Sequence, residues 1–373
     1  MATGGPAAAE PFGVAVVGCG NISNQYLKNL TTFPDVRVLF CADIDAGRAK
    51  AQAAAYGVPA SGTVEQALEH PDVQLVVNLT IPAAHAEVAS AAIAAGKHVW
   101  NEKPLAPDVA AGRAVLEQAR AAGVRVGCAP DTVLGAGVQS ARRLIASGAI
   151  GTPLSALVLF QGQGPESWHP DPEFLFARGA GPLFDMGPYY LSVLATLFGP
   201  ATRVAAIDRK ARGTRVIGSG PRQGTEFAVE MPTYISLLAE YDGGQAASLL
   251  FSWDSPLTRT GFVEITGTEA TLSLPDPNRF DGDLRVRRAG EAEWTVIDSK
   301  GAAAGRGSGV VDMVRAIRHG QPHRASGEMA LHVLEMMTAF ERSGSASAFE
   351  PVESGFDVPE ALTEDWDPYV AAP

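Results

Sequence analysis

Apolar residues follow two different patterns along the chain. From Phe12 to about Gly148, short runs rich in Val, Leu and Ile alternate with Ala-rich stretches of helical character. The runs are FGVAVVG, VRVLFCAD, VQLVVNLT, KHVWNE and VRVGCA. Strands that are apolar along their whole length and separated by helices are typical of a parallel sheet covered on both faces. This part of the chain is therefore predicted to be a doubly wound α/β domain.

After Gly151 the runs become longer and alternate, as in LSALVLFQG, TYISLLAEYD, QAASLLFSW and FVEITG. Alternation with intervening Gly, Asp and Pro turns predicts a largely antiparallel sheet with one open face, in an α+β domain. Two helices are expected near the end, from about Gly309 to His319 and from about Glu328 to Ser343, and Lys210 to Glu226 is expected to be a surface loop. The predicted divisions are a disordered N-terminus at 1–11, a first domain at 12–133 and a second domain at 134–373.

The composition is that of an ordinary globular protein with room for two domains. Apolar residues make up 46% of the 373 residues and charged residues 19%. The formal charge of -12 comes without a basic cluster, so neither nucleic acid nor an anionic membrane surface is an expected partner. No apolar run reaches the roughly 18 residues of a membrane span, and no signal peptide is recognisable. We therefore expect a cytoplasmic protein whose three cysteines are buried free thiols.

The first strand runs directly into the turn GCGNIS and then into a helix. Gly18 and Gly20 stand where the backbone must turn tightly and approach a pyrophosphate, with Asn21 and Ile22 beside it. Ser23 replaces the third glycine of the G-x-G-x-x-G pattern, so the prediction depends on the strand and helix that flank the turn. This context predicts a Rossmann dinucleotide-binding domain.

A carboxylate follows the second strand, about twenty residues beyond the glycine turn. Asp43 ends the run VRVLFCAD. At this position a carboxylate can bind the adenosine ribose hydroxyls of NAD and repel the 2′-phosphate of NADP. NAD is therefore the predicted cofactor, with NADP less favoured. The alternative is that Asp43 only caps the next helix near Asp45.

The third strand ends in Thr80-Ile81-Pro82, with His85 one turn into the following helix. Strand carboxyl ends line the ligand crevice of such sheets, so Thr80, Pro82 and His85 are predicted to border the cofactor. Pro82 also suits the first turn of a helix. For His85, a hydrogen-bonded histidine on a helix face is the alternative.

The run AAIAAGKHVWNEKPLA resembles the AGKHVxxEKP segment of the glucose-fructose oxidoreductase, inositol dehydrogenase and rhizopine-catabolism family, Gfo/Idh/MocA. GAGPLFDMGPYYLSVLATLFGP resembles the family's GGGxxxDxGxHxxD segment, and ASGAIGTP resembles the entry to its C-terminal domain. The likeness implies that Glu102 and Lys103 lie beside the nicotinamide, with Lys103 as the catalytic lysine. It also implies that Asp185 and Tyr189 complete the site.

The resemblance leaves the proton acceptor open, because many members have histidine where this chain has Tyr189. Oxidation of an alcohol needs a base within hydrogen-bond reach of the hydroxyl, and both lysine and tyrosine can serve. A charged Lys103 close to Tyr189 would favour the phenolate. Asp185 would orient the lysine or bind a neighbouring hydroxyl. The alternative is that Asp185 caps its helix and Tyr189 packs in the core.

Further candidates lie outside these motifs. Trp168 and His169, in the loop GPESWHPDPEF, suit sugar recognition by stacking and hydrogen bonding. A metal site at His169, Asp171 and Glu173 is not expected, because the spacing matches no known ligand set and hydride transfer needs no metal. Asp131 follows the last strand and is predicted either to contact substrate or, like Thr132, to cap a helix. His332 is expected in the core, and Arg306 either binds an anion or sits near a helix start.

Together these features predict a dehydrogenase that transfers hydride between a nicotinamide cofactor and a ring hydroxyl or ketone of a sugar, glycoside or inositol. A second class is an NAD-dependent glycosidase or isomerase that acts through a transient ketone and regenerates its cofactor. Release of NADH during turnover distinguishes the two. A third class, a non-catalytic dinucleotide sensor, would need no hydride-transfer residues. The resemblance also implies a homodimer or homotetramer formed through the open sheet.

Overall fold

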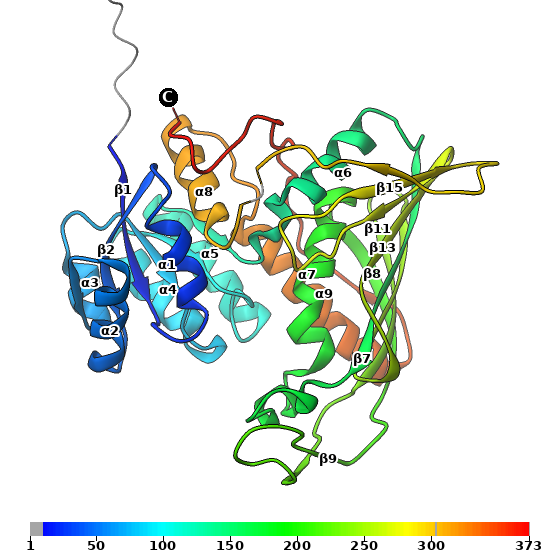
Figure 1. Cartoon of the computed structure of the whole chain (residues 1–373), viewed down its shortest axis with the longest axis horizontal. Coiled ribbons are helices and arrows are strands. Elements are labelled where there is room, and N and C mark those ends of the chain that lie inside the picture. Colours follow the sequence, from blue (N-terminus) through cyan, green and yellow to red (C-terminus); the bar gives the residue numbers. More distant parts are fainter. Residues whose placement is uncertain (1–9, 303, 373) are drawn as a thin grey trace, which may run out of the picture. The chain divides into compact units, whose positions relative to one another are not determined.

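The computed structural model describes residues 10–302 and 304–372. It divides into two compact units, whose ribbons are drawn in Figure 1. The first unit comprises Met1–Ala136, Gly301–Leu331 and Val358–Pro373, and the second comprises Gly137–Lys300 and His332–Asp357. The predicted boundary after residue 133 lies close to Ala136, but two later segments also belong to the first unit. The predicted disordered segment, 1–11, lies outside the described residues except for its last two positions.

The described part of the first unit contains a parallel six-stranded sheet in the order β3-β2-β1-β4-β5-β6. Its strands are β1 (Phe12–Val17), β2 (Val36–Ala42), β3 (Ala60–Gly62), β4 (Leu75–Asn78), β5 (His98–Asn101) and β6 (Val126–Cys128). The helices between them are α1 (Ser23–Leu30), α2 (Ala46–Tyr56), α3 (Val64–Glu69), α4 (His85–Ala94) and α5 (Val109–Ala122). All of β1 is buried. The doubly wound prediction is confirmed, and the strand order reverses beside β1, the point where such sheets bind dinucleotides.

Helix α8 (Ser308–His319) explains why Gly301–Leu331 belongs to the first unit. A Cβ on Gly309 would lie 2.0 Å from the Trp100 ring, so the helix packs directly on β5. Beyond α8, Ala325 O accepts a hydrogen bond of 3.0 Å from Cys128 N of β6. The segment thus covers the last two strands of the sheet. Its amphipathic pattern predicted the helix but could not identify the sheet against which it packs.

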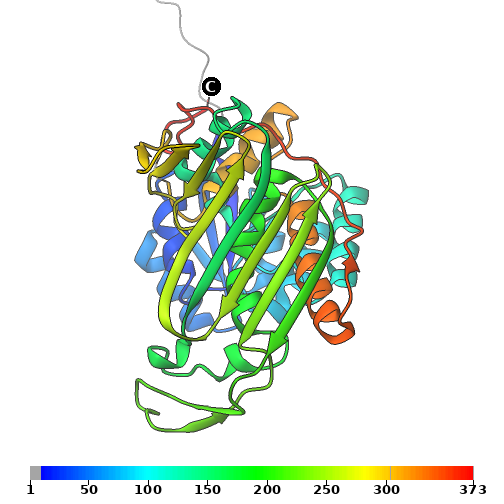
Figure 2. The same ribbon diagram turned by 90° about the vertical axis from the view of Figure 1, so that its right-hand side faces the viewer.

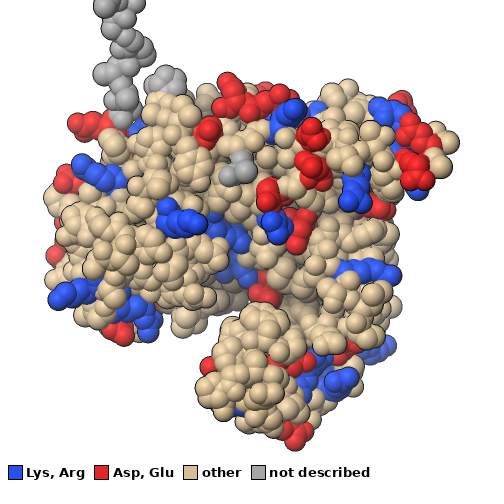
Figure 3. Space-filling view, viewed as in Figure 1, with Lys and Arg blue, Asp and Glu red and all other residues tan. Residues whose placement is uncertain are grey.

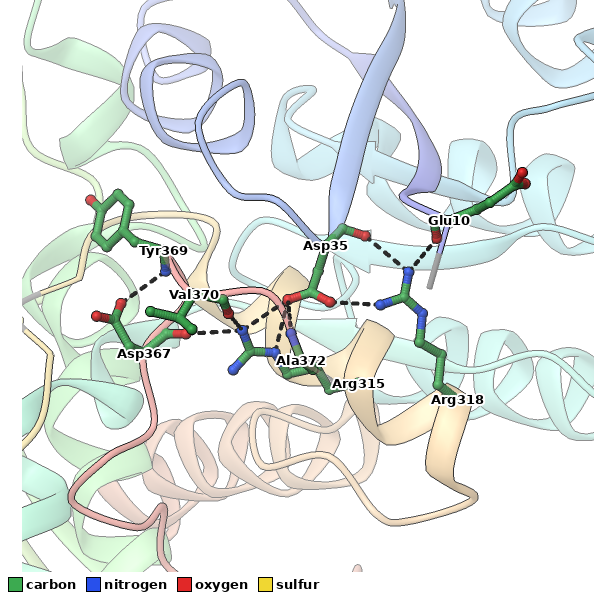
Figure 4. Close-up of polar contacts among 8 residues, drawn as sticks. All are labelled: Glu10, Asp35, Arg315, Arg318, Asp367, Tyr369, Val370 and Ala372. Carbon is green, nitrogen blue, oxygen red and sulfur yellow. Dashed lines mark hydrogen bonds and ion pairs between the residues drawn. The ribbon is translucent and has the colours of Figure 1, made fainter. Parts of the chain in front are cut away.

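A buried carboxylate also ties the C-terminal segment to this unit (Figure 4). Asp35, just before β2, is 2% exposed. Its Oδ2 lies 2.8 Å from Arg315 Nη2 and its Oδ1 lies 2.6 Å from Arg318 Nη1, both from α8. Arg315 Nη2 also donates to Val370 O at 2.6 Å. The chain end is therefore held through the same ion cluster that holds α8.

In the second unit, the described residues form a nine-stranded sheet in the order β16-β15-β14-β13-β7-β12-β11-β8-β17. The strands are β7 (Pro153–Gln163), β8 (Ala201–Arg209), β11 (Tyr234–Tyr241), β12 (Ala246–Ser252), β13 (Asp254–Gly267), β14 (Ala270–Leu274), β15 (Leu284–Arg288), β16 (Thr295–Ile297) and β17 (Glu350–Pro351). Only the β7–β12 pair in this list is parallel, so the largely antiparallel prediction is confirmed.

One face of this sheet has no helix over it, as Figure 2 shows. Along β11 the buried residues alternate with exposed ones, which include Tyr234 and Leu238. The other long helices in the chain are α6 (Ala136–Ala146), α7 (Gly181–Phe198) and α9 (Gly327–Ala346). On α9, His332 is fully buried and its Nε2 accepts from Ala201 N at 2.9 Å, in agreement with the predicted core position.

A small lobe, defined here as residues 164–180 and 213–231, extends from the end of β7. Its two-stranded sheet pairs β9 (Thr214–Val216) with β10 (Glu226–Ala228). Strand β9 lies inside the segment predicted as a surface loop, and β10 begins at its last residue. The strands are three residues each, too short for an alternating pattern. A small apolar cluster lies beside these strands. Its buried residues are Phe176, Ile217, Phe227, Val229 and Trp253.

We expect acid sensitivity from His98, the first residue of β5. Its Nδ1 accepts from Arg125 N at 2.9 Å, and burial, followed by the charges of Arg125 and His323, lowers its pKa from 6.5 to about 4. The unfolded chain takes up this proton near pH 6.5, whereas the folded protein resists it until about pH 4. Acidification across that window therefore favours unfolding. His98→Asn keeps an acceptor without the titration and should flatten the fall in unfolding free energy measured by urea titration at several pH values. His319→Asn, at an exposed position, is the control, and equal slopes for all three proteins would refute the assignment.

Candidate active site

The glycine turn after β1 has the geometry needed for close approach of a ligand. Gly18 has φ +93°, and a Cβ there would lie 2.6 Å from Leu79 C and O, so no larger residue fits. A Cβ on Gly20 would meet no atom within 4 Å, which leaves its backbone open. Ser23, at the start of α1, is buried and its Oγ donates to Gly20 O at 2.6 Å. The turn therefore fits a pyrophosphate even though serine replaces the third glycine.

Asp43 links the glycine turn to the turn after β2. Its side chain accepts from Cys19 N at 2.7 Å and from Asp45 N at 2.9 Å. It does not cap α2, because the N-cap is Asp45, whose carboxylate accepts from Gly47 N and Arg48 N. A carboxylate oxygen has two lone pairs, so Asp43 retains acceptor capacity for a ribose hydroxyl.

The end of β4 is organised by two asparagines that the sequence analysis did not single out. Asn78 and Asn101 occupy the last positions of β4 and β5 and face each other in register. Asn78 Nδ2 donates to Asn101 Oδ1 at 2.9 Å, and Thr80 Oγ1 donates to Asn78 Oδ1 at 2.6 Å. Both asparagines are fully buried. The sequence feature that could have identified this pair is an asparagine at the end of each of two apolar strands.

His85 lies between two loops of the predicted site. It is 1% exposed, with Nδ1 2.6 Å from Pro104 O and Nε2 3.1 Å from Thr80 O. Burial lowers its pKa despite these carbonyls. Pro82 begins a short 3-10 helix just before it. Both ring nitrogens thus face the protein's own backbone, and His85 holds the loop after β4 against the loop after β5.

The carboxylate of Glu102 is fixed on both of its oxygens. Oε1 accepts from Tyr26 OH at 2.8 Å, and Oε2 accepts from Lys103 N at 2.9 Å. Tyr26, on α1, is completely buried, and Trp100 Nε1 contacts its hydroxyl at 3.4 Å. Burial and the charge of Glu102 raise the pKa of Tyr26 well above its usual value, so it remains a phenol that donates. Tyr26, missed in the sequence, therefore fixes the backbone from which the Lys103 side chain extends.

Asp131 follows β6 and is completely buried. Its Oδ2 accepts from Gly307 N at 2.7 Å and from Gly309 N at 3.2 Å, at the start of α8. Its Oδ1 lies 3.5 Å from Arg306 Nη1. Burial raises the pKa of Asp131, and Arg306 opposes that shift. Asp131 thus binds the N-terminus of a helix distant in sequence rather than its own, and substrate contact remains a prediction.

In the second unit, α7 carries Asp185 and Tyr189. The helix is continuous from Gly181 to Phe198 although Pro188 lies inside it. The two side chains, four residues apart, therefore share one face. Tyr189 is 8% exposed. The neighbouring Tyr190 is fully buried and accepts from Gly261 N at 2.8 Å, so its hydroxyl serves the packing of the sheet.

Trp168 and His169 lie in the lobe. Trp168 is 67% exposed, and its ring centroid lies 5.5 Å from that of His169. Arg222 pairs with both Asp171 and Glu173. Across the described part of the chain, no three or more His, Cys, Asp or Glu side chains gather in a way that could hold a metal ion. The acids of this loop are instead paired with the arginine.

The structure groups the predicted residues by unit. Those of the first unit follow the carboxyl ends of β1, β2, β4, β5 and β6: Gly18, Gly20, Asn21, Ile22, Asp43, Thr80, Pro82, His85, Glu102, Lys103 and Asp131. Those of the second unit are Trp168, His169, Asp185 and Tyr189. In a parallel sheet the carboxyl ends lie at one edge, so the first group shares that edge.

Two family models match consecutive parts of the chain. The one described as an oxidoreductase family with an NAD-binding Rossmann fold matches residues 12–129, and the one described as the GFO/IDH/MocA C-terminal domain matches residues 138–273. The chain belongs to the Gfo/Idh/MocA oxidoreductase family. The expected resemblance is thus confirmed, and the first unit is an NAD-binding Rossmann domain, as predicted.

Named proteins are similar to this chain over most of its length. 1,5-Anhydro-D-fructose reductase of Ensifer adhaerens is 28% identical over 264 residues, which cover 69% of this chain and 74% of the reductase. scyllo-Inositol 2-dehydrogenase (NAD(+)) of Bacillus subtilis (strain 168) is 25% identical over 291 residues, 78% of each chain. The structure of levoglucosan dehydrogenase in complex with NADH and L-sorbose superposes with a TM-score of 0.80 at 20% identity, covering 93% of this chain and all of that one.

Proposed function

We propose that this protein is an NAD-dependent dehydrogenase that oxidises a ring hydroxyl of a sugar, glycoside or inositol, or carries out the reverse reduction. The observation that carries the proposal is the fixed position of Lys103. Its backbone is held by Glu102, at the same sheet edge as the open glycine turn. A lysine held beside a dinucleotide turn can bind an alcohol oxygen as the ammonium or accept the hydroxyl proton as the neutral amine.

The residues divide the chemistry as follows. When bound, NAD supplies the nicotinamide ring that takes up hydride. Lys103 donates a hydrogen bond to the substrate oxygen and stabilises the charge that develops there. The hydroxyl proton is accepted either by Tyr189 as the phenolate, with Lys103 as the ammonium, or by Lys103 as the neutral amine. Asp185 orients the lysine or binds an adjacent hydroxyl. Trp168 and His169 are proposed to contact the sugar, and Asp131 to border it.

The substrate class is supported by the names of the relatives. An anhydrofructose, an inositol and levoglucosan are all polyhydroxylated rings, and the structure with NADH also holds L-sorbose. Neutral hydroxylated substrates also suit a chain with a formal charge of -12. On the face drawn in Figure 3, basic and acidic side chains are interspersed, so we expect no nucleic acid partner.

A screen of monosaccharides, glycosides and inositols, with NADH absorbance as the readout, tests the proposal. At least one polyhydroxylated ring compound should give NADH in proportion to product, and simple alcohols should not. Conversion of a glycoside or sugar without net NADH would replace the proposal by the glycosidase or isomerase chemistry. Absence of turnover across all three substrate classes, in a protein that binds NADH, would refute it.

We also propose a cytoplasmic homodimer or homotetramer assembled through the open face of the nine-stranded sheet. No described helix is long and apolar enough to cross a membrane. Leu157, Ile207 and Leu238, from three strands, are 43%, 61% and 49% exposed, and exposed apolar side chains favour association. Leu238→Lys should lower the mass measured by sedimentation, whereas Val216→Lys, in the lobe, should not. A monomeric wild-type protein would contradict the proposal.

A further inference from the structure

The turn between β2 and α2 carries two carboxylates and one guanidinium. Arg48 Nη1 lies 3.7 Å from Asp43 Oδ1, and Arg48 Nη2 lies 3.9 Å from Asp45 Oδ2. The three side chains differ in exposure: Asp43 is 5% exposed, whereas Asp45 and Arg48 are 55% and 53% exposed. The half-exposed guanidinium of Arg48 therefore contacts one buried carboxylate, that of Asp43, and one exposed carboxylate, that of Asp45.

Asp45 also occupies the N-terminus of α2. Its Oδ1 accepts from Gly47 N at 2.9 Å and from Arg48 N at 3.1 Å. Free N–H groups at the start of a helix, with an arginine beside them, form a favourable site for a phosphate. Here a carboxylate of the chain itself binds both the N–H groups and the arginine.

NAD and NADP differ at one position, the adenosine ribose 2′-oxygen, which the position of Asp43 is expected to face. We propose that Asp45 is a second residue that determines cofactor choice: it excludes NADP by occupying the arginine and the helix N–H groups that would otherwise bind the 2′-phosphate. Arg48 is then a phosphate-binding group that Asp45 neutralises. This inference depends on NAD binding by the family and not on the proposed substrate.

The two carboxylates therefore respond differently to substitution. Asp43 accepts from Cys19 N of the glycine turn, so its loss disturbs the pyrophosphate site and weakens the binding of both cofactors. The contacts of Asp45 described above, with Asp43, Gly47 and Arg48, all lie within its own turn and helix α2. Serine at position 45 keeps a neutral N-cap and leaves Arg48 paired with one carboxylate, that of Asp43, instead of two. Asp45 is therefore the position at which NADP binding can be gained without disturbing the glycine turn.

Dissociation constants of NADH and NADPH, measured by fluorescence at low salt on the full chain, test this proposal without turnover. 2′,5′-ADP and ADP serve as probes that lack the nicotinamide. In Asp45→Ser, the ratio of the NADPH to the NADH dissociation constant should fall about tenfold, because one repelling charge is removed and Arg48 keeps one neighbouring carboxylate instead of two. Asp45→Ser with Arg48→Gln should lose that gain.

Asp108→Ser is the matched control, because Asp108 caps α5 through Ala111 N at 2.8 Å in the same way. It should leave the ratio at the wild-type value. An unchanged ratio in Asp45→Ser, or a gain that persists without Arg48, would overturn the proposal. Asp45→Asn, another good N-cap, guards against a folding defect. Loss of NADH binding in both position-45 variants would show that Asp45 only supports the turn.

Discussion

Lys103→Met is expected to lower kcat by about 10³-fold, the largest loss among the substitutions considered. Methionine keeps an unbranched stem but removes the ammonium that binds the substrate oxygen. The fixed carboxylate of Glu102 continues to hold the backbone of residue 103, so the loop should keep its conformation. The measurement is steady-state kcat and KM with NAD and a substrate found in the screen, together with the NADH dissociation constant. A variant that binds NADH and turns over at nearly the wild-type rate would eliminate Lys103 as a catalytic residue.

The same assay separates the lysine from its proposed partners on α7. Asp185→Ala should also lower turnover, because the lysine or a substrate hydroxyl loses its partner. Tyr189→Phe removes only the phenolic oxygen. If Tyr189 accepts the proton, kcat falls and its pH dependence changes; an unchanged kcat and pH profile excludes Tyr189 and leaves Lys103, Tyr190 or a histidine. Tyr190 is a poor substitute, because its buried hydroxyl already accepts from Gly261 N.

The sequence predicted those site residues whose role depends on their position at the end of a strand. Gly18, Asp43, Thr80 and Lys103 all come just after apolar runs, and parallel strands bring such positions to one edge. The supporting contacts could not be predicted in this way. Tyr26 and Glu102 are 76 positions apart, and a tyrosine on an amphipathic helix is ordinarily a packing residue. Their pairing depends on where Tyr26 of α1 meets Trp100 and Glu102 at the end of β5, which no local pattern specifies.

The strands and helices could be predicted where burial leaves a recognisable pattern of apolar residues in the sequence. β1 is buried throughout and reads as an uninterrupted apolar run. β3 has the sequence ASG and no buried residue, so no apolar run indicates it. The segment Gly301–Leu331 was recognised as partly helical but assigned to the second domain, because sequence order was the only guide. Its attachment depends on particular tertiary contacts, such as the packing of Gly309 on Trp100.

The stability of the lobe depends on a buried ion cluster centred on Arg215. Its side chain is 4% exposed and pairs with Glu166 and Asp254, each 14% exposed. Arg215 Nη2 also donates to Trp253 O at 3.0 Å, and the guanidinium lies 5.3 Å from the Phe176 ring centroid. The arginine therefore joins the 3-10 helix Pro165–Ser167 after β7, strand β9 and the start of β13. One cation here compensates two nearly buried carboxylates.

Arg215→Met is expected to lower the free energy of unfolding of the lobe by about 3–5 kcal/mol, because both carboxylates then remain buried without a cation. Trp253, 4% exposed in the lobe's apolar cluster, reports the change by fluorescence during urea titration, and hydrogen exchange at Phe227 and Val229 localises it. Arg222→Met removes an exposed cation from the same lobe and should have little effect. Adding Glu166→Gln and Asp254→Asn to Arg215→Met should recover part of the loss, since the uncompensated charges are then gone. Equal destabilisation by Arg222→Met, or no recovery in the triple variant, would mean that the arginine stabilises the lobe by packing alone.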